Sequence, residues 1–92
     1  MKLSKFPFEL QDGEIMMTLI ISSVDQKIIN HSIICKNTEI LNQIENRLYK
    51  FFPEFSKTEN FFTLNGKKIN KYQNLDENNI KNNDMILLNI ID

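Results

Sequence analysis

The sequence predicts an α+β protein in which two pairs of strands flank one amphipathic helix, in the order ββαββ. Three observations lead to this prediction: two apolar, β-branched runs within residues 15–35, a helical stripe of apolar residues over 40–52, and an Asn65-Gly66 pair between two further strand-like segments. One helix packed on one face of a mixed sheet would bury the apolar side of every element. We therefore expect a single domain around one core.

The composition is that of an ordinary globular domain. The 92 residues are 41% hydrophobic and 25% charged, and the formal charge is only −1. A chain of this length holds one core. The lack of net positive charge argues against a nucleic-acid partner. No apolar run approaches the ~20 residues of a membrane helix, so we expect no membrane insertion. The single cysteine, Cys35, cannot form a disulfide within the chain, which favours an intracellular, reducing compartment and a cytoplasmic location.

Residues 1–14 are expected to form an extended arm ahead of the domain, which spans 15–92. Phe6, Phe8 and Leu10 alternate along this arm. Chain termini are often disordered unless they dock on something. Two aromatic residues in so short an arm favour docking, so we include these three apolar residues among the candidate contacts with a partner.

Two apolar runs over 15–23 and 28–35, separated by a polar break, predict the first hairpin. Successive side chains of a strand alternate between its two faces. The inward residues of the first strand should be Met17, Leu19 and Ile21, and the outward ones Thr18, Ile20 and Ser22. The inward residues of the second strand should be Ile29, His31, Ile33 and Cys35, of which the histidine fits least well.

The helix is predicted to begin at Asn37 or Thr38, because either side-chain oxygen can accept a hydrogen bond from a free amide of the first turn. Pro53 should end it by Phe52. Its sheet-facing stripe should comprise Ile40, Leu41, Ile44, Leu48, Phe51 and Phe52. Its other side should carry Asn42, Gln43, Glu45, Asn46 and Arg47. Residues 54–60 are expected to form a loop, with Phe55 plugged beneath it.

Asn65-Gly66 predicts a second hairpin with a type I′ turn, because both central positions of that turn need positive φ. Leu75 and Ile80 should flank a single turn of helix. Asn82-Asn83 should form another turn. Residues 85–91 are nearly all apolar, which predicts a strand in the middle of the sheet.

The second half of the chain resembles the ubiquitin-like family. The run Phe62-Thr-Leu-Asn-Gly66-Lys-Lys-Ile69 is similar to ubiquitin's strand, Gly-Lys turn and following leucine, and Leu75-Asp-Glu-Asn-Asn-Ile80 is similar to its Leu-Ser-Asp-Tyr-Asn-Ile. The match needs no gap from Phe61 onward. The resemblance implies a ubiquitin-like β-grasp fold, with a mixed sheet and one main helix on one face.

The departures from the family's pattern bear on function. Conjugated members end in a flexible tail closing in Gly-Gly, whereas this chain has no glycine after Gly66 and stops at Asp92. The resemblance therefore implies a non-conjugatable member. The positions that match ubiquitin's receptor-binding patch are Thr63, Leu87 and Asn89, and because two of them are polar we expect ubiquitin receptors to bind poorly.

A different apolar patch is expected on the outward face of the sheet, formed by Ile20, Phe61, Leu87 and Ile91. Scattered apolar residues are normal on protein surfaces, so this patch has to be weighed against that alternative. The candidate partner-binding residues are Ile20, Phe61, Thr63, Leu87, Asn89, Ile91, Phe6, Phe8 and Leu10.

The polar residues do not form the pattern of a catalytic or metal site. His31 and Cys35 would lie ~13 Å apart along one strand at ~3.3 Å per residue, too far to share a metal ion or a proton. Asp76 and Glu77 have no neighbouring histidine and suit capping of a helix start. Lys67, Lys68, Lys71 and Lys81 could meet an acidic partner, but a solvated charged face is the simpler reading. We expect no catalytic residue, metal, cofactor or small-molecule substrate.

The sequence thus predicts a non-catalytic ubiquitin-like protein–protein interaction module, a small adaptor or structural subunit of a larger protein assembly. Its protein partners are not identified by these residues. Two alternatives stay open at this point: a ubiquitin-like modifier, and a ubiquitin-like domain belonging to a larger regulatory enzyme such as a kinase or a ligase.

Overall fold

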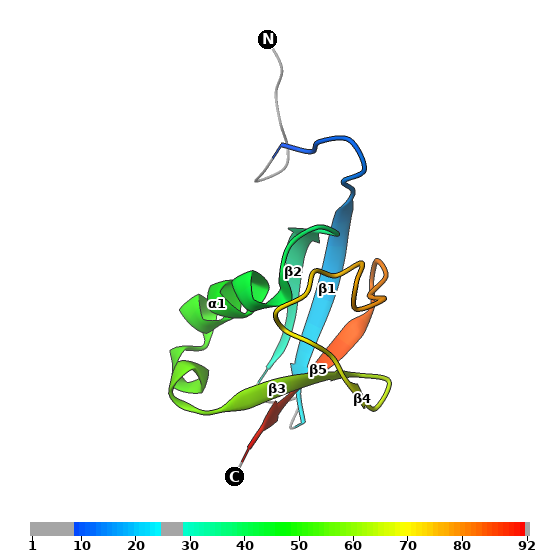
Figure 1. Cartoon of the computed structure of the whole chain (residues 1–92). Coiled ribbons are helices and arrows are strands. Elements are labelled where there is room, and N and C mark those ends of the chain that lie inside the picture. The colour runs from blue at the N-terminus through cyan, green and yellow to red at the C-terminus, as the bar shows by residue number, and fades with distance from the viewer. Residues whose placement is uncertain (1–8, 25–28, 92) are drawn as a thin grey trace.

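The structure is a computed structural model that describes residues 9–24 and 29–91 (Figure 1). The elements follow the predicted order, with a short 3₁₀ helix, η1, after the main helix. They are β1 (Met16–Ser23), β2 (Asn30–Lys36), α1 (Leu41–Phe51), η1 (Pro53–Lys57), β3 (Asn60–Leu64), β4 (Lys67–Lys68) and β5 (Met85–Ile90).

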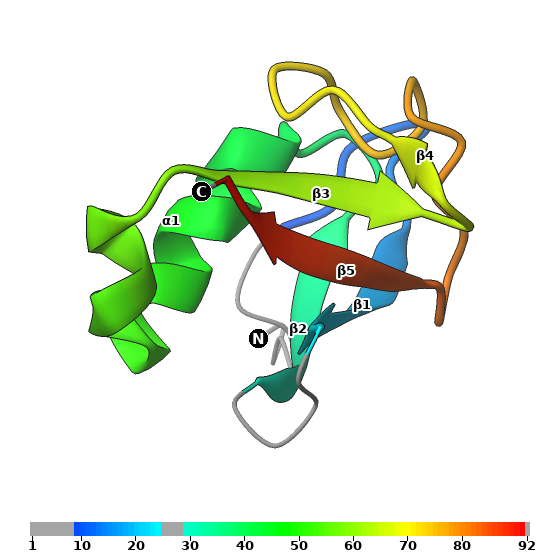
Figure 2. The same cartoon turned by 90° about the horizontal axis from the view of Figure 1, so that it is seen from below.

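The five strands form one mixed sheet in the order β2-β1-β5-β3-β4. β1 and β5 pair in parallel, and the other neighbours pair antiparallel. Figures 1 and 2 show that α1 lies against one face of the sheet, and we call the opposite face the outer face. This is the predicted α+β β-grasp architecture, with β5 in the middle of the sheet as expected from its apolar sequence.

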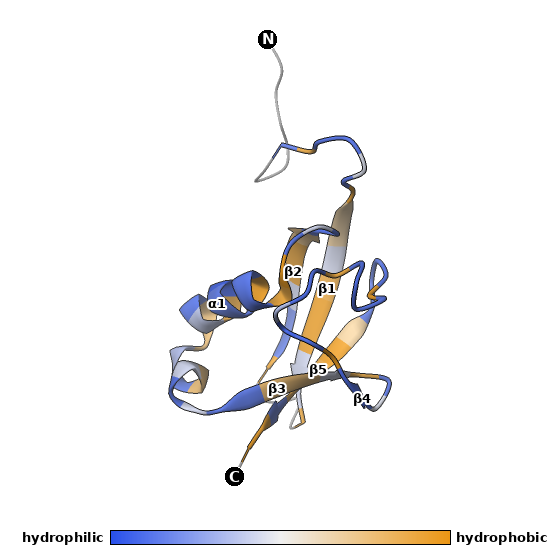
Figure 3. Cartoon of the chain, viewed as in Figure 1, coloured by the Kyte–Doolittle hydropathy of each residue, from blue (hydrophilic) through white to orange (hydrophobic). Residues whose placement is uncertain are grey.

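The core lies between the inner face of the sheet and α1. Hydrophobic residues line β1 and β5, whereas α1 and the loops carry many hydrophilic ones (Figure 3). The predicted inward residues Met17, Leu19 and Ile21 are buried. Phe55 is also buried, which confirms that it plugs the segment after the helix, although Pro53–Lys57 forms a 3₁₀ helix where a loop was expected.

Ser22 lies on the outward face of the sheet, as its alternation with Ile21 predicts, but its side chain is fully buried there, which the alternation does not predict. It lies on the central strand β1, between Asn30 of β2 and Leu87 of β5. Its hydroxyl donates a hydrogen bond to the carbonyl oxygen of Ser23 at 3.0 Å, which satisfies the buried polar group.

The predicted start of the helix was wrong, because α1 begins at Leu41 and no side chain caps it. The side chain of Asn37 is engaged in contacts with distant segments, and the Thr38 hydroxyl donates to Glu14 at 2.5 Å. The first amides of the helix are satisfied by a loop instead. The N–H groups of Leu41 and Asn42 donate to the carbonyl oxygens of residues 73 and 71 at 3.0 and 2.7 Å.

Two residues of α1 lie on a different side from the one expected. Leu41, Ile44 and Leu48 are buried as predicted, but Phe51 is 63% exposed. Phe52, four residues after Leu48, continues the stripe and packs against the core, which leaves Phe51 at the rim. Glu45 was expected to face solvent and is only 4% exposed. Its carboxylate is buried with hydrogen-bonding partners, as described below.

The turns of the second half follow the predicted chemistry. Asn65 and Gly66 have φ of 51° and 83°, and Leu64 pairs with Lys67 across the two-residue turn. Asn83 also has positive φ. The segment between the buried residues Leu75 and Ile80 forms turns, not the expected turn of helix. Glu77 nevertheless takes part in capping there: its N–H donates to Asn74 Oδ1 at 2.7 Å, and its carboxylate accepts from the Asn74 N–H at 2.9 Å.

Replacing Gly66 by valine is expected to lower the free energy of unfolding by more than ~1 kcal/mol. No atom lies within 4 Å of the position where a Cβ would stand, so the cost comes from the backbone conformation at φ 83° and not from a clash. Gly66→Asn is the matched control, because asparagine tolerates positive φ. Equal melting temperatures for the valine variant and the unmodified protein would contradict this account of the turn.

Candidate protein-binding surface

The outer face brings the predicted outward residues of three strands together. Cross-strand partners stand side by side on one face of a sheet. Phe61 of β3 is paired with Asn89 of β5, and Thr63 of β3 is paired with Leu87 of β5. These four residues therefore form one block. Ile20 comes from β1, the next strand across, where it pairs with Met85 of β5.

The apolar members of this set are accessible to a partner. Ile20, Phe61 and Leu87 are partly exposed, and Ile91 is 45% exposed just beyond the end of β5. The N–H of Ile91 donates to the carbonyl oxygen of Glu59 at 2.8 Å, which holds the end of this strand against the chain before β3. The structure thus places each of these predicted residues at or beside the outer face.

The two polar members are occupied with each other. Asn89 Nδ2 donates to Thr63 Oγ1 at 3.3 Å and to the carbonyl oxygen of Leu87 at 3.2 Å. The first of these hydrogen bonds ties β3 to β5 on the outer face, and the second lies within β5. The polar block therefore supplies a fixed platform beside the apolar side chains, with donor and acceptor capacity left over for a bound partner.

The sequence interpretation missed two exposed apolar residues of this face. Met85 is 46% exposed beside Ile20, and Ile34 of β2 is 51% exposed. Both could have been found from the alternation of side chains, because Met85 shares the parity of Leu87, and Ile34 lies between the inward residues Ile33 and Cys35. They extend the apolar face from β5 to the β2 edge.

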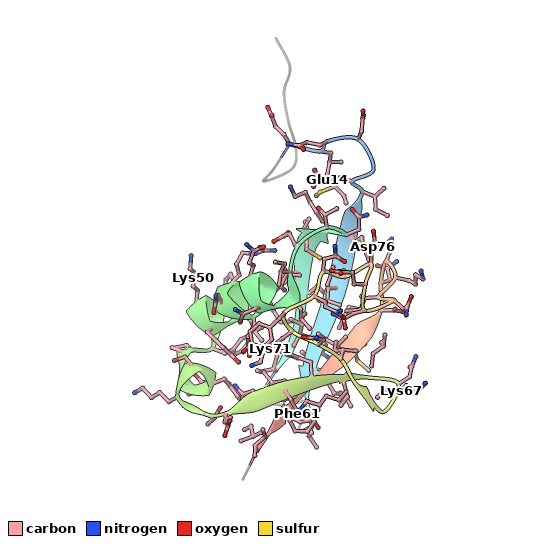
Figure 4. The ribbon with its side chains drawn as sticks, viewed as in Figure 1. Glu14, Lys50, Phe61, Lys67, Lys71 and Asp76 are labelled. Carbon is pink, nitrogen blue, oxygen red and sulfur yellow. The ribbon has the colours of Figure 1, made fainter. Side chains whose placement is uncertain are left out.

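A groove of about 520 Å³ opens where β3 meets the segment after β4, and its lining includes Phe61, Lys68, Tyr72 and Ile91. The Lys68 ammonium lies 5.3 Å from the centre of the Phe61 ring, a cation–π contact. Phe61 projects from β3, and Lys67 lies farther along, at the tip of the β3–β4 hairpin (Figure 4). This groove could not be predicted, because it depends on the path of residues 69–72.

Partly buried hydrogen bonds fix the wall of this groove. The Lys71 ammonium lies 3.4 Å from the carboxylate of Glu45 and 3.2 Å from the carbonyl oxygen of Asn60. The Tyr49 hydroxyl donates to Glu45 and accepts from Asn60 Nδ2, the latter at 2.7 Å. Burial, together with the hydrogen bond to Glu45, raises the pKa of Tyr49 well above its usual value. Since α1, β3 and the 69–72 segment all contribute, the groove is preformed.

The predicted lysine cluster does not act as one unit. Lys71 is turned inward toward Glu45, Lys68 lies over Phe61, and Lys67 is exposed at the hairpin tip. Lys68 is therefore the lysine placed beside the apolar surface.

Of the arm residues, only Leu10 falls within the described part of the chain, and it is 42% exposed. Phe6 and Phe8 lie outside the described residues. The chain after Leu10 is attached to the domain through Glu14, whose carboxylate lies 3.3 Å from the Lys36 ammonium and accepts a hydrogen bond from the Thr38 hydroxyl at 2.5 Å. The hydrogen bond from Thr38 and the Lys36 ammonium lower the pKa of Glu14.

His31 and Cys35 are the residues that would first suggest a catalytic or metal site, but both are packed among hydrophobic or aromatic residues. The His31 ring is half-buried and packs on the rings of Phe51 and Phe52, at 4.8 and 5.7 Å between centroids. Cys35 is fully buried, its thiol lies 3.6 Å from the Met17 carbonyl oxygen, and burial raises its pKa to about 11. Among residues 9–24 and 29–91, no group of three or more metal-ligating side chains comes together.

The buried thiol predicts a loss of stability at alkaline pH. The pKa of Cys35 is raised from 9.0 to about 11, so the folded state disfavours the thiolate. The free energy of unfolding is therefore unaffected by this thiol below pH ~9. It decreases as the pH rises from ~9 toward ~11, by at most ~1.4 kcal/mol per pH unit. Chemical denaturation at pH ~8 and ~10.5 measures the decrease in the free energy of unfolding between these two pH values. This decrease should be about 1–2 kcal/mol smaller for Cys35→Ala than for the unmodified protein. Tyr49 titrates in both proteins, so equal falls would contradict the prediction.

Comparisons with known proteins agree with this architecture. No family model matches the chain, and no curated protein matches it significantly. Among solved structures, a de novo design based on ubiquitin is similar with a TM-score of 0.68 and 13% identity, covering 82% of this chain and 88% of that one. The solution structure of an N-terminal ubiquitin-like domain is similar with a TM-score of 0.66 and 7% identity, covering 100% and 92%. The chain therefore has a ubiquitin-like fold. In addition, none of the helices in the described residues is long and apolar enough to cross a membrane.

Proposed function

Starting from a ubiquitin-like β-grasp fold, we propose that this chain is a non-catalytic protein-binding module, a small intracellular adaptor or structural subunit of a larger assembly. Its domain spans residues 15–92 and its arm residues 1–14. The observation that carries the proposal is the outer face, where Ile20, Phe61 and Leu87 from three neighbouring strands are partly exposed.

The chemistry of this face defines the partner that it fits. Apolar side chains at the centre of an interface supply most of its binding energy, and a polar rim completes it. Here Leu87, Phe61 and Ile91 form the apolar part, and Lys68 lies at its margin against the Phe61 ring. A complementary partner presents an apolar surface with a carboxylate opposite Lys68.

The absence of a catalytic role is part of the proposal. It is supported by the surroundings of His31 and Cys35, which are an aromatic cluster and the hydrophobic core. It is further supported by Glu45, whose carboxylate is bound by Lys71 and Tyr49 below the surface. The arm is proposed as a second contact through Phe6, Phe8 and Leu10, which predicts that a bound partner protects residues 1–10 from proteolysis.

The test compares two substitutions of the same type on opposite sides of the molecule. Phe61→Asp introduces a charge into the outer face, and Phe51→Asp does so at the exposed end of α1. Tagged protein expressed in its native cell is expected to co-purify with one or a few proteins in fixed stoichiometry. Phe61→Asp should lose these proteins at least tenfold, and Phe51→Asp should retain them; circular dichroism establishes that both variants fold.

Three results would contradict the proposal. The first is a protein that migrates only as a free species in native lysate. The second is equal retention of partners by the two aspartate variants, which would move the binding surface elsewhere. The third is a set of higher-mass species that survive denaturing gels, which would indicate a covalent modifier instead of a binding module.

A further inference from the structure

β2 forms one edge of the sheet, and its outward main-chain groups can be identified from the register (Figure 1). The N–H of Asn37 donates to Ile15, and the N–H of Ser23 donates to Ile29. Odd-numbered residues of β2 therefore face β1. Because N–H and C=O directions alternate along a strand, the even-numbered residues Asn30, Ser32 and Ile34 direct theirs away from the sheet.

The two ends of this edge differ. At the C-terminal end, Arg47 Nη2 donates to the Ile34 carbonyl oxygen at 3.2 Å, and the Lys36 N–H donates to Glu39 Oε1 at 3.0 Å. Arg47 and Glu39 also form an ion pair. Toward the N-terminal end of β2, several main-chain groups have no hydrogen-bond partner among the described residues. They are the N–H and C=O of Asn30 and Ser32 and the N–H of Ile34.

The open stretch lacks the features that usually protect an edge strand. Natural edges carry charged side chains, prolines or bulges that prevent another strand from pairing. Residues 30–35 contain no lysine, arginine, acidic residue or proline. The seven consecutive pairs between β1 and β2 contain no bulge. The outward main-chain donors and acceptors from Asn30 to the N–H of Ile34 are therefore open to pairing.

We propose that this edge pairs with the same edge of a second copy of the chain, in antiparallel orientation about a two-fold axis at Ser32. In this register Ser32 lies opposite Ser32 of the second copy, and Asn30 lies opposite its Ile34. The N–H groups of Ser32 and Ile34 then meet free carbonyl groups, and the Asn30 N–H meets the Ile34 carbonyl oxygen through the lone pair that Arg47 does not use. The two five-stranded sheets become one continuous sheet.

The choice of a second copy as the occupant rests on self-complementarity. An uncharged strand can face itself without placing like charges opposite each other. The small Ser32 side chain stands at the axis, and the net charge of −1 gives little long-range repulsion. A foreign extended peptide is usually selected by pockets for its alternate side chains. The groove described above lies at β3 and residues 68–72, near the opposite edge of the sheet from β2, so it cannot supply such pockets to a strand bound at β2.

Sedimentation velocity over a wide concentration range tests the pairing. The unmodified protein is expected to shift reversibly from monomer toward twice that mass. Ser32→Pro removes only an outward N–H and leaves the β1–β2 ladder intact, so it should stay monomeric with retained circular dichroism. Ser32→Ala keeps the N–H and should dimerise like the unmodified protein. An edge of this length buries less area than a standard interface, so the dimer should be weak.

Oxidative cross-linking in a Cys35→Ala background tests the register. Cα atoms of a hydrogen-bonded antiparallel pair lie ~5.5 Å apart, within the range that a disulfide spans. Ser32→Cys should therefore cross-link to its own copy. Asn30→Cys is the control and should not, because its counterpart is displaced by four residues, about 13 Å along the strand.

Several results would overturn the proposal. A monomer at all concentrations would do so, and so would a Ser32→Pro variant that dimerises like the unmodified protein. Dimerisation only after deletion of residues 1–8 would identify the arm as the occupant of the edge. Binding of an extended peptide by a protein that remains monomeric would identify a foreign strand as the occupant.

Discussion

Lys71→Met is expected to lower the free energy of unfolding by about 3 kcal/mol, the largest effect among the substitutions considered. Lys71 is the cation beside the Glu45 carboxylate, whose side chain is only 5% exposed. Removal of the lysine leaves the buried carboxylate without its counter-charge in a medium of low polarity, with the neutral Tyr49 hydroxyl still donating to it. The same substitution frees the carbonyl oxygen of Asn60, which accepts a hydrogen bond from Lys71.

The double variant Glu45→Met/Lys71→Met distinguishes a pair effect from a packing effect. Removal of both charges eliminates the desolvation cost of each, so the double variant should be within about 1 kcal/mol of the unmodified protein. Tyr49 keeps a hydrogen-bond partner there in Asn60. Urea denaturation of the four proteins in the cycle gives the coupling energy. If the two single effects simply add, Glu45 and Lys71 are not coupled and this description of the network is wrong.

Asn37→Ala is expected to cost about 2 kcal/mol, because one side chain connects three segments of the chain. Asn37 Oδ1 accepts from the N–H of Ile15 at 2.8 Å, and its Nδ2 donates to the Gly13 carbonyl at 3.1 Å and to Asp76 Oδ2 at 2.7 Å. Asn37 itself is only 5% exposed. Its loss leaves these groups without their partner and releases the chain before β1.

Thr38→Ala is the matched control for Asn37→Ala. Thr38 is exposed and makes one hydrogen bond to Glu14, so its replacement should cost less than ~1 kcal/mol. Hydrogen exchange should also separate the two variants, since Asn37→Ala should raise the exchange rate of the Ile15 amide specifically. If the threonine variant is the less stable one, Thr38 has a capping role that the structure does not show.

Local signals predicted the fold where the chemistry is itself local. The Asn65-Gly66 turn depends on two residues that accept positive φ, and it was found where the sequence placed it. The alternation that marks Met17, Leu19 and Ile21 as buried is equally local. The apolar content of 85–91 indicated a central strand because such a strand is flanked by others on both sides.

The failures concern polar residues whose partners lie far away in the sequence. Asn37 was expected to cap α1, but Gly13 and Asp76 bind its side chain, and neither is near it in the chain. Glu45 was expected to be exposed to solvent because it lies on the polar side of the helix. Its carboxylate instead contacts the ammonium of Lys71, which is 26 residues away in the sequence. A periodic pattern cannot identify such pairs. The same limit applies to the groove beside Phe61, which requires the path of a loop.

The parallel pairing of β1 with β5 joins the first and last strands of the sheet at its centre. A nascent chain can form the β1–β2 hairpin and α1 early, yet the sheet cannot be completed until residues 85–90 have left the ribosome. Until then β1 and β3 each have one edge without a neighbouring strand. Their apolar side chains, which pack in the core of the complete sheet, are also exposed. Contacts between such distant segments slow folding. Synthesis of this domain therefore includes an interval in which its other strands and its helix exist without the central strand β5, when exposed apolar surface favours chaperone binding.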